Sequence, residues 1–349
     1  MEQNILELNR QLGGEVTNPS DFHNSRGPET DPRMTYRSVV EGRWDENATV
    51  RVRSRPIHQQ ATETALAKRM ERVEYYSRTL VPAAAHPLLL KQAREVQSAL
   101  LLHYNYAFAK ATSTLETNVL NPTLLDLANG LEHISLPEAL RFDARRIYVD
   151  ESYHSLVAED SIRQLAAATG IAPIRQLKPP SFDQIGEVAD EFGRGEFPLV
   201  RFLFSFVLET LVSDTFLLLP DDPSVHPMVR DVVGQHRQDE PVHHAFFRDA
   251  FLSAWPGLAS RDRAITAEAI PRFITGILAP DDSQLELILR EIGIGKAEAA
   301  TVVADSYAAS PLTGNVRKAA KATLRYCRQA GLLNDPAAQV IFRRARLID

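Results

Sequence analysis

Residues 150–154 read Asp-Glu-Ser-Tyr-His and residues 239–243 read Asp-Glu-Pro-Val-His, so the chain contains Glu-x-x-His twice, each time after an aspartate. Successive residues of a helix advance by about 100°, so side chains three positions apart lie within about 60° of each other and can bind one metal ion together. A single copy is weak support, because short motifs occur by chance. Two copies in helical surroundings predict a metal site between helices.

Two further glutamates, Glu116 and Glu209, complete the pattern of a dinuclear site in a four-helix bundle. Such a site takes one Glu from each of two helices and a Glu-x-x-His pair from each of the other two. Glu209 lies within the apolar residues 204–212, where an unpaired buried carboxylate is strongly unfavourable. The expected metal ligands are therefore Glu116, Glu151, His154, Glu209, Glu240 and His243. Iron suits this mixture of oxygen and nitrogen ligands, and manganese fits as well.

His236 and two aspartates extend this site. On one helix, His236 lies about 20° from His243 and can serve as a third imidazole ligand, although an exposed histidine or one beside the metal is the alternative. Asp150 and Asp239 precede ligand glutamates, and such carboxylates often accept the second N–H of a ligand imidazole. We predict a crossed arrangement in which Asp150 bonds His243 and Asp239 bonds His154; the alternative is that both are unrelated helix carboxylates.

Composition and charge restrict the class of protein. The chain has 349 residues, 44% of them hydrophobic, and a net charge of −6, which allows a large core and gives no basic surface for nucleic acid. The single cysteine, Cys327, and the lack of a signal-peptide pattern favour a cytoplasmic protein. The apolar run over residues 197–220 contains Arg201, Glu209 and Asp214, so we expect a buried bundle helix and no membrane partner.

The remaining pattern predicts an all-α chain. Residues 1–57 are polar and interrupted by Gly and Pro, so we expect an irregular N-terminal arm, followed by a single helical domain over residues 58–349. Helices are expected over residues 59–80, 87–116, 136–169, 181–193, 198–220 and 225–254, with three or four more behind them. The second helix should end before Pro122, Ser135 should cap the third, and Pro241 should introduce a kink or a π-bulge beside the metal.

The order of these residues resembles that of the di-iron arylamine N-oxygenases, a family typified by the p-aminobenzoate N-oxygenase of the aureothin pathway and the arylamine oxygenase of the chloramphenicol pathway. Other ferritin-like proteins share the two Glu-x-x-His pairs, whereas the histidine four residues before the last glutamate marks this family. The resemblance covers about residues 90–250, and only Pro241 departs from the expected local pattern. It implies seven protein ligands for two irons: Glu116, Glu151, His154, Glu209, His236, Glu240 and His243.

The resemblance also implies a function. A ferritin-like enzyme of this family uses dioxygen and external electrons to oxidise an aromatic amine to hydroxylamine, nitroso and nitro products, in the biosynthesis of secondary metabolites such as antibiotics. The implied partners are a small aromatic amine, an electron-donor protein or reductant, and a second copy of the chain in a homodimer.

One residue, Arg317, is a candidate for binding a carboxylate on the amine, and a solvated arginine is the alternative. Two other functions remain open. The chain can instead be another ferritin-like dimetal enzyme, of the desaturase or reductase type, or a non-catalytic iron-binding protein.

Overall fold

The structure, a computed structural model, describes residues 38, 40, 43–57, 73–131, 134–175, 181–211, 213–308 and 312–349. Within these ranges every regular element is a helix. The strand-like pairings in this part of the chain are two isolated bridges, Glu74 with Val225 and Leu131 with Ile134. The predicted all-α fold class is confirmed.

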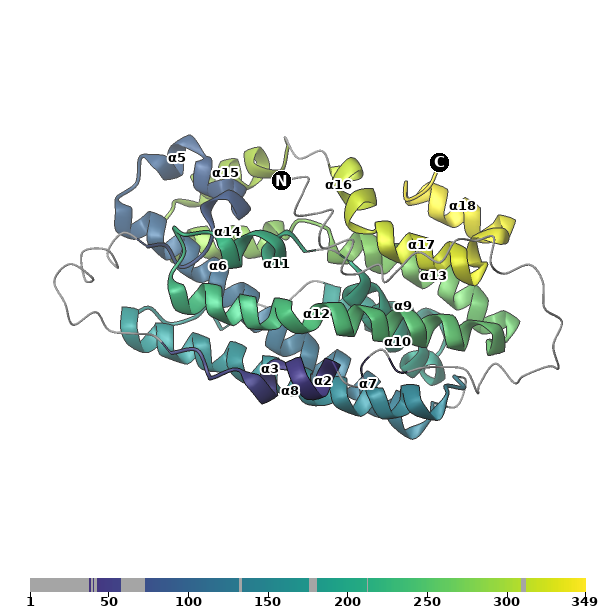
Figure 1. Ribbon diagram of the computed structural model, residues 1–349. Helices are drawn as coiled ribbons and strands as arrows, with labels where there is room; N and C mark the ends of the chain where they lie inside the picture. Colours follow the sequence, from purple (N-terminus) through teal and green to yellow (C-terminus); the bar gives the residue numbers. More distant parts are fainter. Residues whose placement is uncertain are drawn as a thin grey trace, which may run out of the picture.

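Four helical segments form a bundle through the middle of the molecule (Figure 1). They are α6 (Arg94–Leu115), which continues through a π-helix, η5 (Glu116–Leu120), into α7 (Asn121–Asn129), then α8 (Glu138–Thr169), α10 (Phe197–Thr210) and α12 (Pro227–Ala254). Both α6 and α12 pack against α8, and α10 completes the bundle by packing against α12 and α7. This is the four-helix arrangement that the ligand pattern predicts.

Further helices cover the two ends of the bundle (Figure 1). At one end α14 (Asp282–Glu291) packs against α6 and α15 (Lys296–Ala308), and at the other α13 (Ser260–Ile277) packs against α10 and α18 (Pro336–Arg344). The other helices are α2 (Arg43–Asn47), α3 (Thr49–Val52), α5 (Pro87–Leu90), α9 (Ser181–Phe192), α11 (Asp214–Leu218), α16 (Leu312–Ala319) and α17 (Lys321–Ala330). Short 3-10 turns span Arg78–Leu80, Pro82–Ala85, Arg194–Glu196, Leu219–Asp221, Trp255–Gly257 and Leu332–Asn334.

Buried hydrophobic side chains form two clusters along the bundle. One contains Ile147 of α8 and Phe246 of α12, and the other contains Leu165 of α8 and Val233 of α12. On both helices the Glu-x-x-His motif therefore lies between residues of one cluster and residues of the other. The polar groups of the motif are flanked by apolar core on either side, where a charge without a partner is costly.

Several predicted helix boundaries agree closely with the structure. The helices predicted over 136–169, 181–193 and 225–254 are observed as α8, α9 and α12. Gly170 closes α8 in a left-handed conformation, with φ of 72°, which glycine adopts without steric cost. The predicted cap Ser135 is wrong, because Pro137 precedes α8 and no side chain caps this end.

The predicted end of the second helix before Pro122 is also wrong, because the chain stays helical through η5 and α7. Pro122 falls in the first turn of α7, a position that tolerates proline. The N–H of Asn121 instead reaches back five residues to the carbonyl of Glu116. The π distortion expected at Pro241 thus occurs at Glu116, while α12 continues as an α-helix through Pro241.

Residues 59–80 and the N-terminal arm also differ from the prediction. Most of the helix predicted over 59–80 lies outside the described residues, and its described end contains only the turn at Arg78–Leu80. Residues 43–52 of the expected irregular arm form α2 and α3, which pack against α8 and α12. These two helices bury few apolar side chains of their own, so the apolar pattern did not predict them.

The helix predicted over 198–220 ends early, at Thr210, because Leu211 adopts an extended conformation, and α11 follows. By length and composition, Arg194–Asp221 is the one stretch among the described residues that qualifies as a membrane span, although core helices of globular proteins pass the same test. Its central helix α10 packs between α12, α13 and α7, and most of its side chains are buried. It is a core helix of the bundle, as the sequence predicts.

Candidate metal centre

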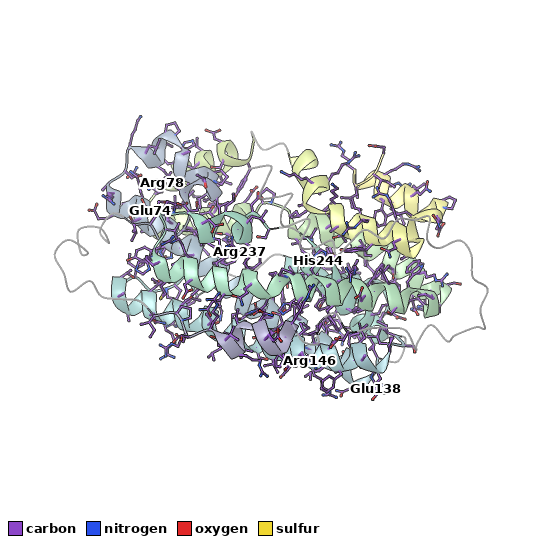
Figure 2. The ribbon with its side chains drawn as sticks, in the orientation of Figure 1. Glu74, Arg78, Glu138, Arg146, Arg237 and His244 are labelled. Atoms are coloured by element: carbon purple, nitrogen blue, oxygen red, sulfur yellow. The ribbon has the colours of Figure 1, made fainter. Side chains whose placement is uncertain are left out.

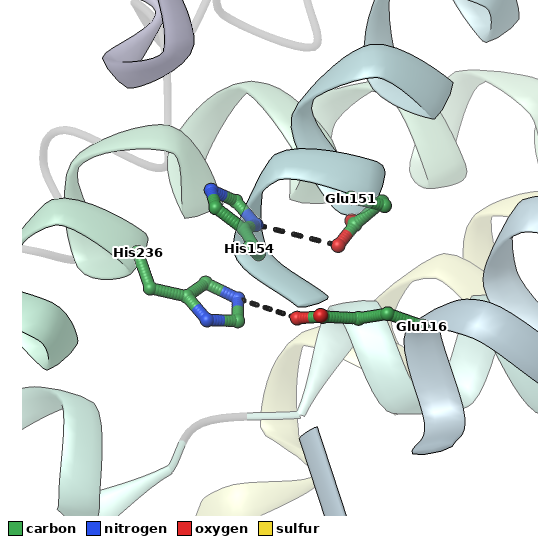
Figure 3. A group of neighbouring side chains, drawn as sticks. All are labelled: Glu116, Glu151, His154 and His236. Atoms are coloured by element: carbon green, nitrogen blue, oxygen red, sulfur yellow. Dashed lines mark hydrogen bonds and ion pairs between the residues drawn. The ribbon is translucent and has the colours of Figure 1, made fainter. Parts of the chain in front are cut away.

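Six of the seven predicted metal ligands gather into two groups in which the ligand atoms lie within 4.8 Å of one another. The first ligand group is Glu116, Glu151, His154 and His236, and Figure 3 shows these side chains facing one another. The second ligand group is Glu151, Glu209 and His243. Glu151 belongs to both groups, so its carboxylate is placed to bridge two ions.

Glu240, the seventh predicted ligand, lies at the edge of this cluster. Its Oε1 is 2.8 Å from Nε2 of His236, which in turn lies 3.7 Å from Oε1 of Glu116. The side chain of Glu240 is 23% exposed, whereas that of Glu151 is 1% exposed. The structure therefore brings all seven predicted residues together, with Glu240 on the more open side.

Four helical segments supply these side chains. Glu116 begins the π-helix between α6 and α7, and Glu209 lies in the last turn of α10. The spacing of three residues puts Glu151 and His154 on one face of α8, and the same spacing applies on α12. A π-helix shifts the helical register locally, so η5 changes the direction of Glu116 relative to a continuous α-helix.

Buried polar atoms without a hydrogen-bond partner are concentrated at this place. They include both carboxylate oxygens of Glu116, Oε1 of Glu151, Oε2 of Glu209 and Nδ1 of His243. Nδ1 of His243 does lie 2.9 Å from Oε1 of Glu151, but not with the direction of a hydrogen bond. Buried polar atoms in proteins nearly always have a partner. These carboxylate and imidazole atoms fit a pair of metal cations, because they are the donor types that iron binds.

The charges of the metal-free cluster are balanced by protons. Burial, together with the charge of Glu151, raises the pKa of Glu116 well above its usual value, and burial also raises the pKa of Glu209. Burial alone would lower the pKa of His154, but its hydrogen bond to Asp239 and the neighbouring carboxylates raise this pKa to about 10. Bound cations would take over the neutralising role of these protons.

The two crossed hydrogen bonds predicted for the aspartates are present. Nε2 of His154 lies 2.9 Å from Oδ2 of Asp239, and Nε2 of His243 lies 3.2 Å from Oδ2 of Asp150. Nδ1 of each ring faces Glu151 instead, at 3.4 Å for His154 and 2.9 Å for His243. An imidazole that donates from Nε2 to an aspartate keeps its lone pair on Nδ1, which is the nitrogen nearer the cluster.

Two other residues lie outside the cluster. His244, which follows the motif histidine His243, has Nε2 2.8 Å from the hydroxyl of Tyr326 on α17, and Figure 2 shows its place on α12. Arg317, the candidate for binding a substrate carboxylate, donates instead to the carbonyl of Arg346 and to Asp349, each at 2.6 Å. These contacts hold the C-terminal residues and lend no support to a role in substrate binding.

A cavity that is partly open to solvent lies beside the first ligand group. It is bordered by His154 and His236, and its walls come from α6, α8 and α12. Thr112, Val157 and Gln235 are among the lining residues that sequence reasoning did not single out. The available signal was their position, because each lies within about one helical turn of a predicted ligand.

Residues 60–331 match the family described as P-aminobenzoate N-oxygenase AurF. The matched range covers most of the chain and contains all seven predicted ligands. The chain belongs to this family. It is a di-iron arylamine N-oxygenase, an oxidoreductase, and the resemblance inferred from the ligand order is confirmed together with the ferritin-like fold. In this N-oxygenase, α2 and α3 precede the matched range, so the family comparison gives no information on them.

Proposed function

We propose that this N-oxygenase binds an aromatic amine in the cavity beside His154 and His236 and oxidises its amino nitrogen with dioxygen. The proposal assigns two irons to seven protein ligands: Glu116, Glu151, His154, Glu209, His236, Glu240 and His243. The observation that carries it is the border of the cavity, which is formed by two imidazoles of the first ligand group. An amine in this cavity would lie beside the residues that would hold one of the irons.

The residues of this chain and the metal have separate parts in this reaction. Iron, when bound, supplies the activation of dioxygen. The aspartates Asp150 and Asp239 hold the orientation of the imidazoles, and the largely apolar helices around the cluster limit the access of water to it. For the first oxidation, amine, dioxygen, two electrons and two protons give hydroxylamine and water, so an external reductant or electron-donor protein must supply the electrons. We propose that further cycles carry the product to the nitroso and nitro stages.

The cavity also suggests which amine is bound. Its described walls contain no Lys or Arg, and polar contacts are offered by neutral groups such as Thr112, Tyr153 and Gln235. A carboxylate on the substrate would therefore meet no Lys or Arg from these walls, and burial of an unpaired charge is costly. We propose an aromatic amine whose other ring substituent is uncharged, such as an amide, in place of p-aminobenzoate itself.

An oxygen-transfer experiment tests both parts of this proposal. The protein is loaded with iron without oxygen, reduced, and exposed to isotopically labelled dioxygen with p-aminobenzamide or p-aminobenzoate. We expect labelled oxygen on the amino nitrogen, with a lower KM for the amide. Formation of ferric mineral without any oxidised amine would identify an iron-binding protein instead, and a lower KM for the carboxylate would contradict the proposed neutral substrate.

A cavity variant provides the structural control. Val232 lines the cavity, so Val232→Phe should raise KM for the amine while two irons remain bound. Val340 on α18 is 44% exposed, and Val340→Phe adds the same atoms at a distant surface. Equal effects of the two variants on KM would remove the cavity from the substrate site.

The assembly and biological setting of the enzyme are inferred from the family and from the sequence. We propose a cytoplasmic homodimer that acts in secondary-metabolite biosynthesis, such as that of an antibiotic, and a division into an N-terminal arm and one helical domain. Light scattering of the purified protein tests the dimer: a mass twice that of the 39.0 kDa chain is expected, and a monomeric mass contradicts it.

A further inference from the structure

We propose that residues 43–56, here called the clamp, position the two imidazoles that face Glu151. In this proposal Trp44 acts through Asp150 on His243, and Thr49 acts through Asp239 on His154. The inference rests on the metal ligands assigned under the proposed function. The clamp lies before residue 60, where the family match begins, so it is a feature of this chain that the family comparison does not describe.

The first connection runs from α2 to the imidazole of His243. The indole Nε1–H of Trp44 lies 2.8 and 2.9 Å from the two carboxylate oxygens of Asp150. Oδ2 of Asp150 then lies 3.2 Å from Nε2 of His243. Asp150 and His243 are buried, so the indole is a donor that the carboxylate cannot replace with bulk water. The direction of the carboxylate, and with it that of the ring, depends on Trp44.

The second connection runs from α3 to the imidazole of His154. Thr49 is fully buried and donates twice to Asp239, from its backbone N–H at 3.1 Å and from its hydroxyl at 2.5 Å. Oδ2 of Asp239 lies 2.9 Å from Nε2 of His154. The clamp thus makes the same kind of contact twice. On α8 and again on α12, a clamp residue donates a hydrogen bond to an aspartate that contacts a motif imidazole.

Further contacts fix the clamp to α12. Nε2 of Gln238 donates to the carbonyl of Asn47 at 2.7 Å, and Oε1 of the same side chain accepts from the guanidinium of Arg53 at 2.7 and 3.0 Å. Nε2 of Gln235 donates to the carbonyl of Ser54 at 3.0 Å. Gln238 directly precedes Asp239 in the sequence, so this anchoring is made next to the aspartate that Thr49 contacts.

The clamp then crosses to α8. Arg55 pairs with Asp160 at 2.7 Å, and Nε2 of Gln164 donates to the carbonyl of Pro56 at 3.0 Å. The segment therefore bridges the two helices that carry the Asp-Glu-x-x-His motifs, and Figure 1 shows α2 and α3 beside α8 and α12. Loss of a hydrogen-bonded partner behind a metal ligand lowers metal affinity by about 10–100-fold. For substitutions of the clamp residues we expect a loss of metal affinity of about tenfold, because these residues are one hydrogen bond further from the metal.

Cobalt(II) binding tests the clamp without using the oxygenase reaction. The full-length protein is titrated with Co²⁺ against a chelator, and the visible absorption of the bound ions is recorded. Trp44→Phe and Thr49→Val should each lower the affinity about tenfold and change the absorption bands, because the geometry around the ion changes. Thr49→Ser keeps the hydroxyl and should restore both the affinity and the bands. Two ions should still bind at saturation.

Matched controls come from positions away from the ligand groups. Trp255 is partly buried beside Arg263 at 5.2 Å, as Trp44 is beside Arg51 at 5.2 Å, and Thr266 of α13 is a fully buried threonine whose hydroxyl donates to the carbonyl of Asp262. Trp255→Phe and Thr266→Val should leave cobalt binding unchanged. Thermal unfolding of each metal-free variant identifies any variant that does not fold, and should Thr49→Val not fold, Trp44→Phe decides the question.

The outcomes separate the clamp from the proposed function. Wild-type affinity and bands in Trp44→Phe and Thr49→Val would overturn the clamp, and so would equal losses in the two controls. Weakened cobalt binding in the clamp variants would uphold it even where no amine is oxidised. A wild-type protein that binds no cobalt would overturn both the ligand assignment and the clamp.

Discussion

Helices α8 and α12 carry the same Asp-Glu-x-x-His pattern, but the two copies have different surroundings. Glu151 of α8 is buried and has an oxygen in both ligand groups, whereas Glu240 of α12 is partly exposed and lies beside His236. The cavity touches His154 of α8 and His236 of α12, but not His243. Equal spacing along a helix therefore does not give equal roles, because the neighbours across the bundle differ.

The aspartates of the two copies differ in the same way. Burial raises the pKa of Asp150, although the contacts with His243 and Trp44 oppose this rise. Burial acts on Asp239 as well, but hydrogen bonds from His154 and Thr49 outweigh it and lower its pKa. Asp239 is therefore the more firmly charged of the two. The comparison predicts that corresponding substitutions in α8 and α12 have unequal effects.

The largest difference is expected between the two motif glutamates. Glu151→Gln should abolish the binding of both ions, because its carboxylate belongs to both ligand groups, while Glu240→Gln should keep at least one. Metal content per chain after iron loading and gel filtration measures this, with thermal unfolding as a check of folding. Equal metal loss in the two variants would show that Glu151 is not the shared ligand.

Without metal, the buried carboxyl and imidazole groups should make the stability of the protein depend on pH. The folded pKa values of Glu116, Glu209 and His154 are raised, so the folded protein binds more protons than the unfolded chain at pH 7. The free energy of unfolding of the metal-free protein should therefore fall from pH 7 to 9, by up to about 1.4 kcal/mol per pH unit for each extra proton. Urea unfolding at the two pH values measures it.

Iron-loaded protein is the control for this pH dependence. Bound cations replace the protons, so the loaded protein should be more stable at pH 7, by about 2.7 kcal/mol when free metal is 100 times its Kd. His154→Gln should reduce the pH dependence of the metal-free protein, because it removes the imidazole whose pKa is raised to about 10. A metal-free protein whose stability does not change between pH 7 and 9 contradicts the assignment of these protons.

A smaller difference is expected between the aspartates. Asp239→Asn and Asp150→Asn should each weaken metal binding by about 10–100-fold, with the larger loss for Asp239. The reason is that Asp239 accepts two hydrogen bonds from Thr49 besides its contact with His154. Competition with a chelator measures both affinities. A larger loss of metal affinity in Asp150→Asn than in Asp239→Asn would contradict this prediction.

The smallest difference concerns the residue that follows each motif histidine. On α12, Tyr326→Phe removes the hydroxyl that contacts buried His244, so it should lower the free energy of unfolding by about 1–3 kcal/mol. On α8, Ser155 is partly exposed, and Ser155→Ala should change the free energy of unfolding by no more than about 0.5 kcal/mol. Urea unfolding measures both, and both variants should bind two irons. A larger loss of unfolding free energy in Ser155→Ala than in Tyr326→Phe would show that burial does not decide the difference.

The sequence predicted which candidate ligands the structure brings together, because their pattern is local. The spacing of Glu and His fixes which side chains share a helix face, and the crossed aspartate bonds followed from their place next to each glutamate. The sequence predicts a kink or π-bulge at Pro241 and a helix end before Pro122, because proline breaks helices by local rules. The helix instead continues past both prolines, with the π-helix directly before α7, and Pro241 lies inside a long helix that packs on α8 and α10.

The contacts of the N-terminal arm could not be predicted from local sequence patterns. Trp44 and Thr49 lie in a polar segment without apolar periodicity, and their partners Asp150 and Asp239 are about 100 and 190 residues away. By itself the sequence determined the bundle, the metal-binding residue types and the family. Only the tertiary structure decided that Glu151 belongs to both ligand groups and that the cavity opens beside His236. It also decided that the arm donates hydrogen bonds to the aspartates behind the imidazoles. These depend on contacts between helices, which spacing along one helix does not determine.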